Sequence, residues 1–432
     1  MRILLTGATG FIGRRLAAAL LAQGHRLRCV SRSPAPQIAN AGAATWVQLD
    51  FARMTSAAHW VDALEGCDVV INAAGILRSQ GSNTLERVHA EAPCALFQAA
   101  RARGIERVIH ISALGADEAA ASAYHRTKKA GDDCLRRLGI AHCIVQPSLV
   151  FGLDGASAQL FMRMAAMPVI PLPGRGEAMI QPVHIDDLVQ AVLALLRTPA
   201  ADMPPVLAVT GPSPMTLRAY YAGLRDAMRI AAPARFLPVP APAMRLAARA
   251  GDRLGLAMLN SETLGMLARG NTGDPRPLTR LLGREPRAPQ AFLDADCAAA
   301  VGARARMAWL LPLLRASIAL VWIVTAIVSA FGYPLSESHD LLRRAGVPEA
   351  MLAWALYGAI ALDLLFGVAV LWPRRPRWIW VGQALLVIGY TAIISVRLPE
   401  FWLHPYGPIV KNAPFLAALW LLYEMDEKPW KS

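Results

Sequence analysis

The chain has 432 residues, a formal net charge of +13 and a mean hydropathy of +0.36. This length predicts two or three domains, and a charged fraction of only 17% excludes a simple soluble enzyme, so a membrane portion is expected. The positive charge is arginine scattered through alanine-rich stretches without a nucleic-acid-binding module. We therefore expect no nucleic-acid partner. The anions that this positive charge attracts are expected to be lipid headgroups or cofactor phosphates.

The first 150 residues alternate short β-rich runs with helical stretches. The runs are apolar on both faces, as in ILLTG, DVVINAA and RVIHIS, which is typical of a parallel sheet covered by helices. The pattern predicts an α/β fold with a doubly wound parallel Rossmann sheet over residues 1–150. The predicted strands are Arg2–Thr6, Arg26–Ser31, Thr45–Leu49, Asp68–Asn72, Arg107–Ser112 and Ala141–Gln146, with helices at Leu85–Arg103 and Ala123–Leu138.

The strongest motif is TGATGFIG, which follows the first predicted strand and opens the first helix. Glycines there allow a tight turn and let backbone N–H groups approach a pyrophosphate at the positive end of the helix. A motif placed between a strand and a helix in this way predicts dinucleotide binding. Cofactor contacts are expected from Thr6, Gly7, Gly10, Phe11, Ile12 and Gly13.

The end of the second strand favours NADP(H) over NAD(H). An NAD site carries a carboxylate there for the ribose 2′-hydroxyl, whereas this chain has Ser31 and Arg32. Arg32, helped by Arg14, is expected to pair with a 2′-phosphate; the alternative is that both are ordinary surface arginines. Asp50 either contacts the adenine or caps the next turn. The small residues Asn72-Ala73-Ala74-Gly75 leave room for the cofactor beside the fourth strand.

Ser112, Tyr124 and Lys128 are the candidate catalytic residues. The four-residue spacing of Tyr124 and Lys128 places a phenol and an ammonium on one face of a helix. A tyrosine with a pKa near ~10 is a poor acid or base at neutral pH, and a neighbouring Lys⁺ is expected to lower that pKa. Ser112 is expected to hydrogen-bond a substrate carbonyl or hydroxyl. The alternative is a surface tyrosine and lysine without a catalytic role.

Several motifs, taken in order, resemble the atypical/extended short-chain dehydrogenases/reductases of the NAD-dependent epimerase/dehydratase superfamily. They are TGATGFIG, NAAG, HISALGAD, SAYHRTKKAGD, QPSLVFG and QPVHIDDLVQAV, and they span about residues 1–295. The similarity is greatest to the branch of the NAD(P)H-binding accessory subunit of respiratory complex I, which includes members that bind nucleotide without known turnover. The resemblance implies the glycines at the pyrophosphate, Arg32 at the 2′-phosphate, Ser112–Tyr124–Lys128 as the catalytic set, Lys128 and Pro147 at the cofactor, and Gln181–Ile185 near the pocket.

Residues 151–300 have a looser pattern with Pro and Gly clusters, and they predict a mostly helical substrate lobe that completes the first unit. From Met307 the composition becomes strongly apolar, and residues 305–432 predict an all-α, four-helix transmembrane domain. The expected spans are 308–330, 351–372, 378–396 and a weaker 408–423. The stretch HPYGP followed by KNAP is similar to DoxX-like membrane domains, and it supports the fourth span.

Basic residues predict how these helices are oriented. GARARM before the first span and PRRPR between the second and third place both segments, and the Rossmann domain, in the cytoplasm. Arg343 and Arg344 lie in the loop between the first and second spans, which would then be on the opposite side of the membrane, so they count against this orientation. Within the membrane, Arg315 and Asp363 are expected at a similar depth and are predicted to form an ion pair; the alternative is a protonated Asp363 hydrogen-bonded to a neighbouring helix.

The six cysteines are widely spaced and lack a C-x-x-C motif, so reduced thiols, no disulfide and no metal site are expected. Together these features predict an NADP(H)-dependent oxidoreductase of a bacterial-type inner membrane, multi-pass, acting on the carbonyl or alcohol of a lipophilic small molecule. Membrane lipid is an expected partner, and a membrane-protein partner is allowed. Two alternatives stay open: a non-catalytic NAD(P)H-binding or redox-sensing subunit, and a nucleotide-sugar epimerase/dehydratase.

Overall fold

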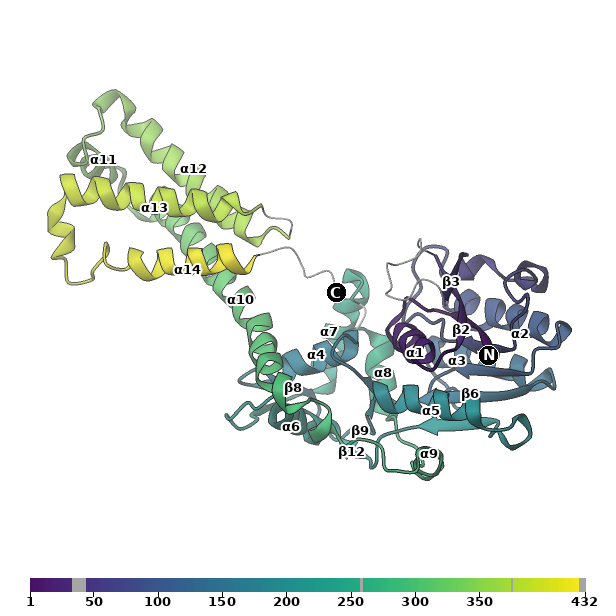
Figure 1. Ribbon diagram of the computed structural model, residues 1–432. Helices are drawn as coiled ribbons and strands as arrows, with labels where there is room; N and C mark the ends of the chain where they lie inside the picture. Colours follow the sequence, from purple (N-terminus) through teal and green to yellow (C-terminus); the bar gives the residue numbers. More distant parts are fainter. Residues whose placement is uncertain (33–43, 257–258, 374–375, 427–432) are drawn as a thin grey trace. The chain divides into compact units, whose positions relative to one another are not determined.

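The computed structural model describes residues 1–32, 44–256, 259–373 and 376–426. The chain forms two compact units, residues 1–305 and 306–432. Unit 1 contains the β-sheet, and unit 2 consists of helices (Figure 1).

Unit 1 is built on a parallel sheet with the strand order β11-β6-β5-β4-β1-β2-β3. The six predicted strands are confirmed to within one residue. The seventh strand was not predicted, because its short VLAV run directly follows a proline pair. The bounds are β1 Arg2–Thr6, β2 Arg26–Ser31, β3 Ala44–Gln48, β4 Val69–Asn72, β5 Arg107–Ile111, β6 Ala141–Pro147 and β11 Val206–Val209.

Helices cover both faces of this sheet, as the two-sided apolar strands require. Leucines of α1 (Phe11–Ala22) and α5 (Ile185–Arg197) pack with one side of the strands. Residues of α2 (Ala92–Ala102) and α3 (Ala123–Arg137) pack with the other. The chain runs from β1 outward to β2 and β3, then returns to β4 on the opposite side of β1. The crevice where the strand order reverses is the usual ligand position in such sheets.

The remainder of unit 1 is the mostly helical lobe that the sequence predicts. Three short strand pairs, β7·β10, β8·β13 and β9·β12, connect its helices. The strand bounds are β7 Val150–Phe151, β8 Ile170–Pro173, β9 Met179–Ile180, β10 Val183–His184, β12 Met215–Thr216 and β13 Phe236–Val239. The helices are α4 Ala156–Ala165, α6 Leu217–Ala227, α7 Ala241–Leu254, α8 Ser261–Arg269 and α9 Arg276–Leu282.

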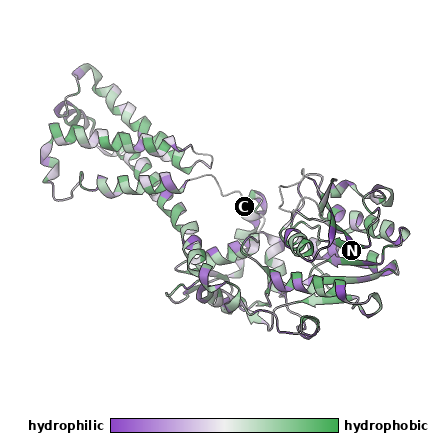
Figure 2. Cartoon of the chain, viewed as in Figure 1, coloured by the Kyte–Doolittle hydropathy of each residue, from purple (hydrophilic) through white to green (hydrophobic). Residues whose placement is uncertain are grey.

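Unit 2 is helical, and hydrophobic residues predominate in its long helices (Figure 2). Three described stretches are long and apolar enough to cross a membrane: Ala295–Gly332, Glu349–Leu371 and Trp378–Arg397. They contain the first three predicted spans to within one residue. The helices are α10 Ala295–Ile327, α11 Leu335–Arg344, α12 Leu352–Leu371, α13 Trp378–Arg397 and α14 Asn412–Met425.

The fourth predicted span corresponds to α14, which has only 14 residues. A helix of this length rises about 21 Å, less than the ~30 Å of a hydrocarbon core. Leu419 and Leu422 of α14 nevertheless pack with Trp380 and Val387 of α13. The helix therefore belongs to the bundle, but it is too short to span a membrane on its own.

The predicted Arg315–Asp363 ion pair is wrong, because Arg315 pairs with Asp426 at the end of α14. In α12, Gly367 packs against Ala319 and Ile323 of α10, and the two helices run in opposite directions (Figure 1). Arg315 and Asp363 therefore lie on opposite sides of this contact, about 12 Å apart along the axis.

Asp363 is itself buried, and its Oδ1 atom has no hydrogen-bond partner within the described residues. The structure therefore provides neither the predicted ion pair nor, at this oxygen, the alternative hydrogen bond. Asp426 was missed as the partner of Arg315 because it follows the weak fourth apolar segment in a short acidic tail.

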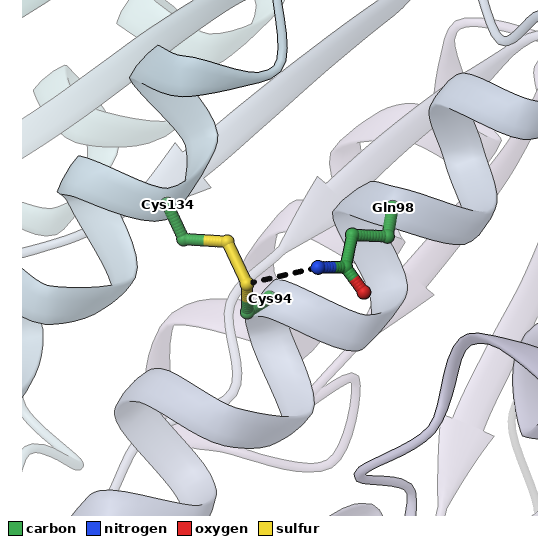
Figure 3. The surroundings of a disulfide bond; sticks show 3 residues. All are labelled: Cys94, Gln98 and Cys134. Carbon is green, nitrogen blue, oxygen red and sulfur yellow. Dashed lines mark hydrogen bonds between the residues drawn. A yellow bond between two sulfur atoms is a disulfide. The ribbon is translucent and has the colours of Figure 1, made fainter.

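The expectation that all cysteines are reduced is also wrong, because Cys94 and Cys134 form a disulfide (Figure 3). Cys94 lies on α2 and Cys134 on α3, and their Cα atoms are 5.7 Å apart, within the usual range for a bridge. The pairing was not predictable because 40 residues separate the two and it depends on how α2 and α3 pack. Cys29, Cys67, Cys143 and Cys297 are free thiols.

Candidate active site

The turn between β1 and α1 leaves no space for a side chain at Gly7 or Gly13. Gly7 has a φ of +67°, a left-handed conformation that favours glycine. A Cβ atom on Gly7 would lie 2.5 Å from the Ala73 carbonyl oxygen, and one on Gly13 would lie 2.0 Å from the Gly7 carbonyl oxygen. The first turn of α1 has no acidic residue and no side-chain cap. Its N–H groups and its helix dipole therefore suit a pyrophosphate.

A buried polar network lies beneath this turn. The Thr6 hydroxyl donates to Asn72 Oδ1 (2.5 Å), and Asn72 Nδ2 donates to His110 Nδ1 (3.0 Å). His110 Nε2 in turn faces Asp132 Oδ1 at 3.4 Å. Burial lowers the pKa of His110, against the opposing effect of Asp132. The network links the carboxyl ends of β1, β4 and β5, and so fixes the floor of the crevice.

The two arginines expected at the 2′-phosphate, Arg32 and Arg14, differ in their surroundings. Arg32 is exposed just after β2, next to the undescribed residues 33–43. Arg14 pairs with Asp154 in the loop after β7, so it is already neutralised by a carboxylate. Asp50 gives no side-chain cap to the following turn, and instead forms an ion pair with Arg53 at 3.3 Å. Arg32 therefore remains the arginine available for the phosphate.

Ser112 is buried at the end of β5, and its hydroxyl donates to Asp132 Oδ2 at 2.8 Å. Asp132 was not predicted as part of the site. It lies on α3 eight residues after Tyr124 and four after Lys128, so the helical spacing could have indicated it. Because its own proton is held by Asp132, the Ser112 oxygen presents lone pairs to a substrate hydroxyl.

Tyr124 is half-buried near the start of α3, in edge-to-face contact with the rings of His89 and His125. Burial raises the pKa of Tyr124 to about 12, and the charge of Asp132 adds to this rise. The expected decrease of the phenol pKa is therefore wrong in its net direction, because burial and Asp132 outweigh any stabilisation of the phenolate by Lys128. A phenol with this pKa keeps its proton at neutral pH, and can act as a proton donor.

Lys128 is buried one turn after Tyr124, and its Nζ donates to the Ile111 carbonyl oxygen at 3.0 Å. Burial lowers the pKa of Lys128 to about 8, against the opposing charge of Asp132. A Cβ atom on Gly75 would lie 3.3 Å from this Nζ. The lysine therefore borders the segment after β4 that the sequence assigns to the cofactor.

His89 also holds the segment after β4. Its Nε2 accepts a hydrogen bond from the Ile76 N–H at 3.1 Å, and its Nδ1 contacts the Thr127 hydroxyl at 3.0 Å. Burial lowers the pKa of His89 to about 2, and the charge of Lys128 adds to this decrease. His89 is therefore a neutral structural histidine, and it contacts both the segment after β4 and α3.

The helical hairpin α7–α8 also reaches the site, which the sequence did not indicate. Glu262 of α8 accepts a hydrogen bond from the Tyr124 N–H at 2.8 Å. Arg269 pairs with Asp117 at 2.6 Å and donates to the Gly115 carbonyl oxygen. Both contacts hold the segment between β5 and α3, so they position the start of the helix that carries Tyr124.

The segment Gln181–Ile185 supports the lobe through its side chains. Gln181 is fully buried, where its amide donates to Thr210 and Gly211 and accepts from the Gly273 N–H. His184 caps α5 by accepting a hydrogen bond from the Asp186 N–H. These hydrogen bonds stabilise the lobe, so the segment has a structural role. Pro147 ends β6, and its carbonyl accepts from the Leu114 N–H.

Two segments of the chain match known protein families. Residues 3–209 match the NAD dependent epimerase/dehydratase family, and residues 319–420 match the DoxX-like family. The chain is therefore similar to these two families in its two units. The match to the first family includes the glycine turn, Ser112, Tyr124 and Lys128, and the second begins within α10 and ends within α14.

Two curated relatives each match about half of the chain. A ceramide reductase of Caulobacter vibrioides is 32% identical over 203 residues, which are 46% of this chain and 61% of the relative. Subunit 9 of the NADH dehydrogenase [ubiquinone] 1 alpha subcomplex of Mus musculus is 28% identical over 214 residues, which are 48% of this chain and 56% of the relative. The chain thus spans less than two thirds of either relative.

Solved structures show the same fold. A nucleoside-diphosphate-sugar epimerase of Staphylococcus aureus superposes with a TM-score of 0.56 at 19% identity, covering 68% of this chain and 99% of that chain. A UDP-glucuronic acid 4-epimerase of Bacillus cereus gives a TM-score of 0.51 at 18% identity, covering 72% and 100%. At these identities the likeness concerns the fold alone.

Proposed function

We propose that the protein is a membrane-anchored, NADP(H)-dependent reductase of a lipid carbonyl. The observation that carries this proposal is the four-residue spacing of Tyr124, Lys128 and Asp132 along α3, with Asp132 hydrogen-bonded to Ser112 and Lys128 beside the segment after β4. A protonated phenol, a buried lysine and an oriented serine hydroxyl at one helix suit proton transfer to a carbonyl oxygen.

The cofactor is NADP(H) in this proposal. The bare main chain around Gly7 and Gly13 fits a pyrophosphate, and Asn72–Gly75 supplies the small residues beside it. The exposed Arg32 is the expected partner of the 2′-phosphate, since Ser31 and Arg32 provide no carboxylate for a ribose hydroxyl. Exchange of Arg32 for Asp should reverse the preference between NADPH and NADH.

Tyr124, Lys128 and Ser112 control the transfer of a proton to the carbonyl oxygen in this reaction. When bound, NADPH supplies the hydride that goes to the carbonyl carbon. Tyr124 donates its phenolic proton to the carbonyl oxygen, and Lys128, while charged, stabilises the phenolate that remains. Ser112 accepts a hydrogen bond from the new hydroxyl, because its own proton is directed to Asp132. The reaction therefore converts a ketone or aldehyde to an alcohol.

A lipid substrate is supported by two independent features. The described residues include three helices long and apolar enough to cross a membrane, and the curated relative of Caulobacter vibrioides is named a ceramide reductase. We therefore place the substrate among long-chain, ceramide-like carbonyl lipids. Membrane lipid is the natural partner of such a protein, and a second membrane protein is compatible with the complex I relative.

The proposed location is a bacterial-type inner membrane with unit 1 in the cytoplasm. Arg304 and Arg306 precede the first span, and Arg377 precedes the third; Arg374 and Arg375 of the same basic loop lie outside the described residues. At the opposite end of the bundle, Arg344 pairs with Glu400, which holds the two remaining loops together.

The test of this function is turnover of a long-chain ketone presented in mixed micelles with NADPH to the full-length protein. Tyr124→Phe should lower kcat by about 10²–10⁴-fold and leave NADPH affinity within about twofold. Tyr220→Phe is the matched control, since the buried Tyr220 hydroxyl has no hydrogen-bond partner among the described residues. Normal NADPH binding without turnover of any lipid carbonyl by the wild type would instead support a non-catalytic nucleotide-binding subunit.

A further inference from the structure

The α7 helix presents an apolar and basic surface that the fold of unit 1 does not use. Only Ala248 and Gly251 of this helix are buried, while Leu246 is 69% and Leu254 75% exposed. No residue of the following helix α8 is buried. The hairpin therefore adds little to the core. Its leucines are exposed to solvent, which is unfavourable in water and indicates an interaction surface.

Three arginines accompany these leucines. Arg245, Arg249 and Arg253 are all exposed and follow each other at four-residue intervals, so they form one stripe along the helix. Leu246 lies beside this stripe, and Asp252, the acidic residue of the helix, is held by Ser261. We call the surface formed by Arg245, Leu246, Arg249, Arg253 and Leu254 the α7 face.

Further exposed leucines extend the α7 face toward the site. Leu256 and Leu259 flank the connection to α8, and Leu77 lies in the loop after β4, all of them exposed. This loop reaches the end of α7, because a Cβ atom on Gly255 would lie 3.2 Å from the Arg78 guanidinium. The loop after β4 and Tyr124, through Glu262, are thus both in contact with the hairpin.

The charge and composition of the α7 face match an anionic lipid surface. Basic residues beside exposed leucines on one helix are typical of helices that lie in the headgroup layer. Unit 1 is joined to helices that can cross a membrane, so a bilayer is always close to it. A separate protein with an acidic groove would not be held close to unit 1 in this way. No other part of the described chain covers these leucines.

We propose that the α7 face binds the headgroup layer of an anionic phospholipid bilayer. Leu246 and Leu254 enter the boundary between headgroups and acyl chains, and the three arginines bind lipid phosphates. This contact places the α7–α8 hairpin, and through Glu262 the start of α3, at the membrane surface. A lipid substrate, if the proposed reaction is correct, then reaches Tyr124 without crossing bulk water.

The experiment uses the full-length protein in nanodiscs, with photoreactive benzoylphenylalanine in place of Leu246. Val206, exposed on the edge strand β11, is the control position. Discs of phosphatidylcholine alone are compared with discs containing 30% phosphatidylglycerol, at about 0.15 M salt. The readout is the yield of lipid adducts by mass spectrometry, with the thermal unfolding midpoint as a check on folding.

We expect a lipid-adduct yield at position 246 at least tenfold above that at position 206, and only with the anionic lipid. Changing Arg245, Arg249 and Arg253 to Gln should lower the ratio of docked to free hairpin about fivefold for each arginine. Equal yields at both positions, adducts to a second copy or another protein, or independence of phosphatidylglycerol would each overturn the proposal. Because the readout needs no turnover, lipid adducts without ketone reduction would contradict the proposed reaction alone.

Discussion

Lys128 is the residue whose protonation should limit the reaction at high pH. Its pKa of about 8 lies below the ordinary value of 10.5 because the ammonium is buried, whereas Tyr124 keeps its proton up to about pH 12. We expect kcat/KM for ketone reduction to be flat below pH 8 and to fall above it, since neutral Lys128 no longer stabilises the phenolate. A pH profile of Lys128→Met should lack this decline at a uniformly lower rate.

Lys129→Met is the control for that profile, because Lys129 is at the surface, paired with Asp133 and Glu118. The same shift affects stability. The unfolded chain binds the proton of Lys128 more tightly than the folded one, so the free energy of unfolding should rise with pH between about 8 and 10.5. A decline of kcat/KM that survives in Lys128→Met would contradict this assignment.

Asp132 sets the protonation of both neighbours. Its negative charge raises the pKa of Lys128 and of Tyr124. The variant Asp132→Asn should therefore move the high-pH decline of kcat/KM to lower pH, whereas Asp133→Asn, at the neighbouring surface position, should not. Asp132→Ala should also lower the free energy of unfolding by about 1–3 kcal/mol, because Ser112 loses its buried partner. An unchanged pH profile in Asp132→Asn would show that the carboxylate is uncharged or remote.

Individual site residues were predictable only where a local motif identifies them. The glycine turn and the pair Tyr124 and Lys128 follow from spacing within one turn or one helix. Glu262 reaches Tyr124 across 138 residues of sequence, and nothing local indicates such a contact. The pKa of Tyr124 was predicted in the wrong direction because spacing shows the neighbouring charge, but not the burial that outweighs it.

At the scale of elements, the parallel strands were predicted well because burial on both faces gives continuous apolar runs. The strand β11 was missed because four residues after a proline pair give too little pattern. The fourth predicted span, 408–423, differs from the structure at its start, because residues 408–411 form turns and the helix begins at Asn412.

The bridge between helices α2 and α3 gives a prediction about the compartment of unit 1. Cytosolic thiols are kept reduced, so if unit 1 is cytoplasmic, cells denatured directly in an alkylating reagent should yield Cys94 and the buried Cys134 as alkylated thiols. The bridge would then form only on oxidation after lysis. In the purified, oxidised protein the bridge should add about 3–4 kcal/mol to the free energy of unfolding, from a separation of 40 residues. A bridge found intact in freshly alkylated cells would place unit 1 on the oxidising side.

At the scale of the whole molecule, the fusion of two units was predictable from composition, because apolar content changes abruptly near Met307. The structure divides the chain close to this point, after Ala305. Pairings inside unit 2 were not predictable, since the depth of Arg315 relative to Asp363 depends on the contact of Gly367 with α10. Hydropathy gives the extent of each span but not this register.

The account depends most on nucleotide binding at the turn after β1. The most direct measurement is titration of the full-length protein in detergent with NADPH and NADH, for the wild type and Gly13→Ala. Gly265→Ala is the control, because a Cβ atom on this helical glycine meets no atom within 4 Å. We predict saturable binding to wild type, tighter for NADPH, and its loss by at least 100-fold in Gly13→Ala alone. No affinity of the wild type for either nucleotide, or equal affinity in Gly13→Ala, would contradict the account.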